Sequence, residues 1–194
     1  MYFEKDDIYH IYNMGNNSQP IFFSEENYRF FLRKIENEIK PVCDIIAYCL
    51  MPNHYHLMVK ANEGSVKNFD NSNLQLLSRK IGTLQSSYTQ AINKQYGTSG
   101  SVFRQKAKAK SLSQVFLGAE RYFDYALSCF VYIHQNPLKA GLVKRIKDWE
   151  FSSFQEYSSA NELSICNKPL ALEVLGIEKE KFKGIFYRET SYEL

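Results

Sequence analysis

Two histidines separated by one residue, His54 and His56, are the side chains of this sequence best suited to holding a metal ion. They lie in an apolar run, residues 54–60, which the alternation of residue types predicts to be a β-strand. Because alternate side chains of a strand share a face, both imidazoles would project from one side of a sheet. Neutral imidazole is the commonest protein metal ligand, so the pair indicates a metal site. The alternative is two surface histidines that bind nothing, since the pattern is short.

Tyr132 and Asn136 form a second pair, four residues apart in a predicted helix. Side chains at this spacing are neighbours on one helical face. An amide oxygen can act as a metal ligand beside two histidines, and a phenol close to the same ion can act as a nucleophile. The alternative is that Tyr132 is a core aromatic residue and Asn136 satisfies carbonyls at the helix end. The neighbouring residues His134 and Gln135 stay open as ligands in place of Asn136.

A third group of residues is basic and lies in a predicted extended run, residues 102–112. On a strand its four cations would face one side as a ladder of positive charge; they are Arg104, Lys106, Lys108 and Lys110. Phosphates bound there would release counterions, so nucleic-acid binding by this ladder and Lys60 would be salt-sensitive. The alternative is an edge strand whose lysines prevent pairing with another chain.

These residues require a sheet and helices to position them. The predicted strands are residues 8–14, 43–50, 54–60 and 102–112, and the predicted helices are residues 25–39, 74–95, 114–135 and 170–175. The order within residues 8–112 is βαββαβ, the split βαβ or ferredoxin-like pattern: an antiparallel α+β sheet with its two helices on one face and its first and third strands central. The helix bearing Tyr132 would be an addition that Asn136 and Pro137 end, and residues 62–73 a polar loop.

Bulk properties narrow the class of protein. The 194 residues suit one domain, and a hydrophobic fraction of 44% provides a sizeable core. No apolar run is long enough to cross a membrane, and the acidic N-terminus is unlike a signal peptide, so we expect a cytoplasmic protein without a membrane partner. The four cysteines lack the CxxC spacing of a zinc knuckle or redox pair. A net charge of +3 hints only weakly at nucleic acid.

Taken together, several segments resemble the HUH single-tyrosine transposases, and among them the REP-associated tyrosine transposases. The matching segments are Tyr12-Asn13-x-Gly15, residues 48–57 around the histidines, Ser87-Tyr88-Thr89 with Asn93-Lys94, residues 132–143 and residues 148–153. The resemblance makes residues 1–157 an HUH transposase domain and residues 158–194 a C-terminal tail of unknown role.

The resemblance implies a function and a role for each site residue. His54 and His56 would bind a divalent metal ion, Mg²⁺ or Mn²⁺, Asn136 would complete the metal site, and Tyr132 would be the nucleophile. Family members cut single-stranded DNA beside a small hairpin. Attack by the tyrosine would leave a 5′-phosphotyrosine link and a free 3′-hydroxyl, so that strands can be rejoined. Two departures concern DNA contacts: members often have Arg where Met14 stands and Trp near Phe103.

Two other functions compete with strand transfer. A domesticated protein could bind a DNA or RNA hairpin without cutting it, which needs the basic residues but not Tyr132. A metallohydrolase could use a metal-bound water and would form no protein–DNA adduct. The residues leave open whether a homodimer forms and whether Tyr132 acts beside the histidines of its own chain or of a partner.

Overall fold

The computed structural model of the protein describes residues 1–70, 72–112, 118–159, 164–178 and 182–186. At its centre lies a sheet whose neighbouring strands are antiparallel, in the order β2-β3-β1-β4. The strands are β1 (Ile8–Met14), β2 (Cys43–Met51), β3 (His54–Ala61) and β4 (Lys108–Ser111). The first and third strands are central, as predicted, and the α+β class is confirmed.

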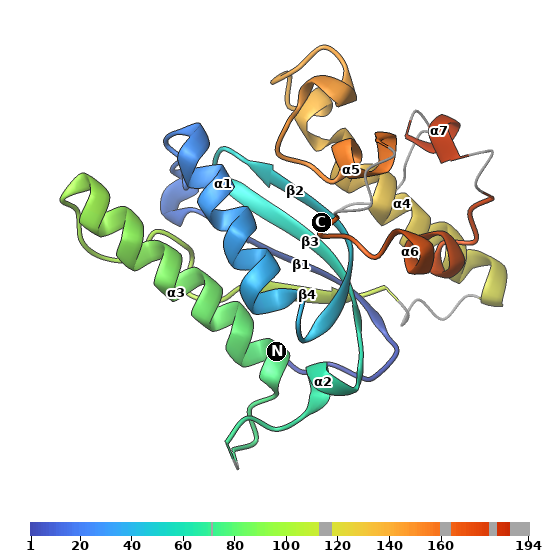
Figure 1. Ribbon diagram of the computed structural model, residues 1–194, viewed down its shortest axis with the longest axis horizontal. Coiled ribbons are helices and arrows are strands. Elements are labelled where there is room, and N and C mark those ends of the chain that lie inside the picture. The colour runs from blue at the N-terminus through green and yellow to red at the C-terminus, as the bar shows by residue number, and fades with distance from the viewer. Residues whose placement is uncertain (71, 113–117, 160–163, 179–181, 187–194) are drawn as a thin grey trace.

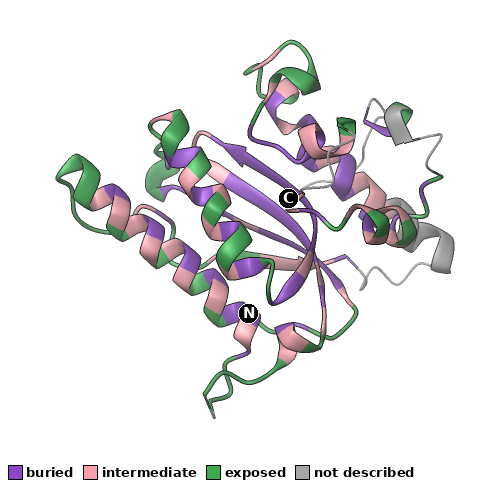
Figure 2. Cartoon of the chain, in the orientation of Figure 1, coloured by how far each residue is buried: buried purple, intermediate pink, exposed green. Residues whose placement is uncertain are grey.

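Helices α1 and α3 pack on one face of this sheet (Figure 1). Their bounds are Glu25–Lys34 for α1, which continues as a π-helical turn over Ile35–Ile39, and Leu76–Tyr96 for α3. The segment predicted as a polar loop contains a short helix, α2 (Glu63–Val66), capped by Asn62. The core between sheet and helices includes the fully buried side chains of Ile11, Phe31, Tyr55, Leu57 and Tyr88, and Figure 2 shows the strands buried along most of their length.

The opposite face of the sheet is covered by α4 (Gly118–Lys139), which lies on the other side of the sheet from α1 and α3 in Figure 1. The chain then forms α5 (Phe154–Ser158), α6 (Lys168–Val174) and α7 (Phe182–Ile185). These elements join a second core that includes Cys49, Met58, Phe130, Ile133 and Phe186. No helix in the described stretches is long and apolar enough to span a membrane.

The predicted end of the helix that bears Tyr132 is wrong. Asn136 and Pro137 do not stop α4, which contains Pro137 and runs on to Lys139. Proline removes one backbone donor, but the next turn still closes, because the Ala140 N–H donates to the Asn136 carbonyl at 2.9 Å. The helix ends at Lys139, and Gly141 follows in the turn beyond it with a φ of +70°, which suits glycine. Asn136 therefore lies inside the helix, in its last turn.

The predicted fourth strand is too long, because its first half bulges out of the sheet. Gly15 bridges to Phe103, whereas Tyr12 pairs with Lys108, so residues 104–107 lie opposite Asn13 and Met14 alone. The Asn13 amide holds this bulge by donating to the Arg104 carbonyl at 3.1 Å. Arg104 and Lys106 are therefore outside the regular strand, and the ladder of four cations is reduced to Lys108 and Lys110.

Candidate metal and nucleophile site

A cluster of aromatic rings lies on the α4 face of the sheet, supplied by β1 and β3. Cross-strand register places Tyr12 opposite His56 and Met14 opposite His54. The His54 and His56 ring centroids are 4.8 Å apart, and the His10 centroid is 5.0 Å from that of His56. The period-two alternation predicted for β3 therefore does bring the two histidines together on the face that α1 and α3 leave open.

The packing of α4 brings Tyr132 into the same cluster. Its ring centroid lies 5.7 Å from that of His56 and 6.3 Å from that of His10, in edge-on geometry. All of these rings belong to one chain. The tyrosine and the histidine pair, which the sequence separates by more than seventy residues, thus share one site without help from a second copy.

The histidines of the cluster are held in their neutral form. Burial lowers the pKa of His54 to about 4. Burial, reinforced by Lys110 and His54, lowers the pKa of His10 to about 3, and the pKa of the fully buried His56 falls well below its usual value for the same main reason. A metal ion needs the unprotonated imidazole, and these histidines are in the form that a metal ligand would require.

The hydrogen bonds indicate which ring nitrogens can face a metal ion. His54 Nδ1 lies 2.6 Å from the Asn53 side-chain oxygen, which only accepts, so the lone pair of His54 is on Nε2. His56 Nδ1 lies 2.9 Å from His10 Nε2. Among the described residues, the buried His56 Nε2 has no hydrogen-bond partner. An orphaned buried nitrogen is costly unless a ligand satisfies it, so this atom fits a metal ligand.

In the part of the chain that the structure describes, the histidine pair has no third histidine, cysteine or carboxylate placed to share a metal ion with it. Within the described stretches, no group of three or more His, Cys, Asp and Glu side chains could hold a metal ion. A cation held by His54 and His56 would complete its shell with oxygen donors such as an amide, water or the substrate phosphate. That mixture of donors suits Mg²⁺ or Mn²⁺ better than an all-histidine site would.

Asn136 remains the candidate amide ligand. Its nitrogen donates to the Tyr132 carbonyl at 3.0 Å. Burial raises the pKa of the Tyr132 hydroxyl, and a side-chain hydrogen bond with Asn136 acts in the opposite direction. Asn136 therefore touches the predicted nucleophile directly.

The two alternative ligands point into the second core instead. His134 is fully buried, with Nδ1 2.7 Å from the Phe130 carbonyl and Nε2 2.8 Å from the Ser153 hydroxyl, so both its nitrogens are engaged. The Gln135 amide donates to the Phe186 carbonyl at 3.0 Å. Geometry therefore favours Asn136 over both neighbours.

The predicted DNA-binding cations do not form one surface. In the register of β1 and β4, Lys108 lies opposite Tyr12 and Lys110 lies opposite His10, so both lysines are on the face of the histidines. Lys108 Nζ lies 5.9 Å from the centre of the Tyr12 ring. Lys60 lies further along β3, and its ammonium group forms an ion pair with Asp6 at 3.2 Å. The first two are thus well placed for a phosphate near the cluster, whereas Lys60 is not.

His10 is the functional candidate that the sequence reasoning missed. It is fully buried and contacts His56, yet an isolated histidine in an apolar strand gives no motif. A usable signal was present: His10 and Tyr12 alternate on β1 in the same way as His54 and His56 alternate on β3. Only the antiparallel register, however, places His10 beside His56.

Comparisons with known proteins bear on the family. No protein-family model matches the chain. A curated relative from Haemophilus influenzae, named as a REP-associated tyrosine transposase, is 25% identical over 136 residues, which cover 64% of this chain and 69% of the relative. A solved structure described as the REP-associated tyrosine transposase bound to a REP hairpin superposes with a TM-score of 0.56 at 17% identity, over 85% of this chain and 87% of that one, which establishes the shared fold. Sequence and fold thus agree with the motifs, and the resemblance of this chain to the REP-associated tyrosine transposases is confirmed.

Proposed function

We propose that the protein is a metal-dependent single-strand DNA endonuclease and strand transferase that acts at hairpin-flanked DNA. The observation that carries the proposal is the buried, unpartnered Nε2 of His56 in a ring cluster that also contains Tyr132. A protein that only bound hairpins would have no need for neutral imidazoles beside a phenol. The names of the sequence relative and the solved structure support a transposase, and the latter is bound to a REP hairpin.

Each candidate residue of the site would have its own role in strand cleavage. His54 and His56, with the Asn136 oxygen, would hold Mg²⁺ or Mn²⁺, which when bound polarises the scissile phosphate and stabilises charge on its oxygens. Tyr132 Oη would attack phosphorus as the bond from phosphorus to the 3′-oxygen breaks. The 3′-oxygen takes up a proton, and the 5′-phosphate stays on Tyr132. Lys108 and Lys110 would neutralise neighbouring phosphates.

The covalent link makes rejoining possible without ATP. The phosphotyrosine keeps the energy of the broken phosphodiester, so a second 3′-hydroxyl can attack it and release the phenol. An ordinary phenol is a weak nucleophile at neutral pH, and burial raises the pKa of Tyr132 further. The hydrogen bond with Asn136 favours the ionised form of the half-buried phenol, and a cation held by the histidines would supply further activation.

The test is adduct formation with an end-labelled DNA hairpin that carries single-stranded flanks, in Mn²⁺, on a denaturing gel. Wild-type protein should give a covalent adduct, and Tyr132→Phe should abolish it. Tyr12→Phe is the matched control, because Tyr12 is the other phenol of the cluster, 6.3 Å from His56 between ring centroids. It should retain the adduct.

Each other result identifies a competing function. Cleavage that survives Tyr132→Phe without an adduct indicates a metal-bound water as nucleophile. Tight binding of the hairpin with neither cleavage nor adduct in the wild-type protein indicates a binding-only protein. An adduct that is lost in Tyr12→Phe but kept in Tyr132→Phe assigns the nucleophile to β1.

A further inference from the structure

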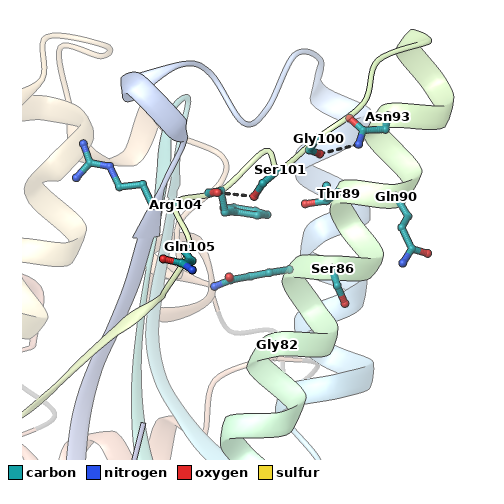
Figure 3. Close-up of a pocket in the computed structure, with 11 residues that line it drawn as sticks. Gly82, Ser86, Thr89, Gln90, Asn93, Gly100, Ser101, Arg104 and Gln105 are labelled. Carbon is teal, nitrogen blue, oxygen red and sulfur yellow. Dashed lines mark hydrogen bonds between the residues drawn. The ribbon is translucent and has the colours of Figure 1, made fainter.

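A groove runs along α3, on the other side of the sheet from the ring cluster. Two adjoining cavities of about 470 Å³ and 320 Å³ share Gly82, Gln85 and Gln105, so they form one trough between α3 and residues 100–107 (Figure 3). We refer to it as the α3 groove. Neither the histidine pair nor Tyr132 lines it.

The walls of the α3 groove mix polar and apolar side chains and lack negative charge. From α3 come Gly82, Ser86, Thr89 and Asn93, three or four residues apart and hence on one helical face. No carboxylate lines either cavity. The sequence has no Asp or Glu between residues 70 and 120, whereas this stretch carries Arg79, Lys80, Lys94, Arg104, Lys106, Lys108 and Lys110. Charge of this kind attracts a polyanion.

A hydrogen-bond network holds the far wall of the groove in place. The Gln85 amide donates to the Tyr55 hydroxyl at 2.6 Å, and the Asn13 amide lies 3.2 Å from the Gln85 oxygen. Asn13 also holds the Arg104 carbonyl, so the bulge of residues 104–107 is tied to both α3 and the sheet. The groove is therefore preformed, which lowers the entropy cost of binding a flexible strand.

The groove leads toward the catalytic face. The Arg104 N–H donates to the Met14 carbonyl at 2.9 Å, and Met14 pairs with His54 in the sheet. The groove therefore ends only two strands away from the histidine pair. In Figure 3 the Arg104 side chain extends away from α3, whereas Thr89 and Ser101 face the groove.

We propose that the α3 groove binds the unpaired DNA strand next to the hairpin and directs it around the sheet edge to the histidine face. Amide and hydroxyl side chains in the groove would bond to base edges, and Arg104 and Lys106 would neutralise phosphates. The inference rests on the proposed function, because it takes DNA as the substrate. It also gives Arg104 and Lys106 a role in DNA binding. They lie in the bulge and so cannot be part of a ladder of cations along the strand.

Gly82 provides the test, because it lines both cavities and a side-chain carbon added there would meet nothing within 4 Å. Gly82→Glu and Gly82→Gln add side chains of equal size, and only the first adds negative charge. Binding is measured by fluorescence anisotropy with a chelator present, using a blunt DNA hairpin and the same hairpin with short unpaired flanks. Wild-type protein should prefer the flanked hairpin.

Gly82→Glu should weaken binding of the flanked hairpin about tenfold through like-charge repulsion and leave binding of the blunt hairpin unchanged. Gly82→Gln should weaken binding of the flanked hairpin less than Gly82→Glu does. Equal affinity of Gly82→Glu and wild type for the flanked hairpin overturns the proposal, as does equal weakening for both hairpins. So does an effect seen only with RNA flanks. The binding measurement needs neither a metal ion nor cleavage. If the strand-transfer proposal alone fails, the protein should therefore still bind the flanked hairpin more tightly but form no adduct.

Discussion

The hydrogen bond between His10 and His56 determines which nitrogen of His56 can reach a metal ion. If His56 Nδ1 carries the proton and donates to His10 Nε2, the lone pair of His56 is left on Nε2, the atom without a partner. In the opposite arrangement Nε2 would carry the proton and could not bind. Metal-binding histidines commonly need such a partner for their second nitrogen. We therefore expect His10 to act as a positioning residue for His56.

His10→Ala should weaken Mn²⁺ binding about tenfold in the absence of DNA, because His56 loses the group that orients it. Isothermal titration calorimetry measures this directly. His10→Gln should recover part of the affinity, since an amide oxygen can accept from Nδ1, and Tyr12→Phe on the same strand should leave it unchanged. Equal Mn²⁺ affinity in His10→Ala and wild type would show that the contact has no positioning role.

At the scale of elements, the position of α4 decides whether Tyr132 reaches the histidines. His134 of α4 connects this helix to β2 through Ser153. Its Nδ1 contacts the Phe130 carbonyl one helical turn away, and its Nε2 contacts the Ser153 hydroxyl. The same hydroxyl accepts from the N–H of Tyr48, a residue of β2, at 2.9 Å. The pKa of this fully buried histidine is lowered to about 4 by burial, although the bond to Phe130 acts in the opposite direction.

The lowered pKa predicts a pH-dependent stability. Because the unfolded chain binds this proton more readily, the contribution of His134 is complete above its unfolded pKa of about 6.5 and is lost as the pH falls toward 4. The free energy of unfolding should therefore drop by up to about 1.4 kcal/mol per pH unit in that window. Urea unfolding at pH 7 and pH 5 should show a smaller drop for His134→Gln than for wild type; equal drops would contradict the assignment.

At the scale of the whole molecule, one chain holds a complete set of candidate groups. Two cores sandwich the sheet. The C-terminal segment contributes Cys166 to the first core and Phe186 to the second, where the Phe186 ring lies 5.6 Å from that of Phe130. The division into residues 1–157 and a separate tail stays a prediction. Deleting the tail would nevertheless expose the surface of α4 that carries Phe130.

The single-chain site predicts that Tyr132 acts beside its own histidines. An equimolar mixture of Tyr132→Phe and His56→Ala should therefore form no adduct with the flanked hairpin, because neither chain has both groups. Denaturing gels measure the outcome, with each variant alone as the control. Restored adduct in the mixture would instead indicate a homodimer that exchanges its nucleophiles.

The sequence by itself determined the first three strands, the faces of the long helices and the pairing of His54 with His56. Each of these follows from local periodicity, since a period of two or 3.6 fixes the face on which a side chain lies. Only the tertiary structure decided that His10 supports His56, that residues 104–107 bulge and that α4 continues past Pro137. Those features depend on contacts between distant segments, such as Asn13 with Gln85 and Arg104, whose distances no local pattern encodes.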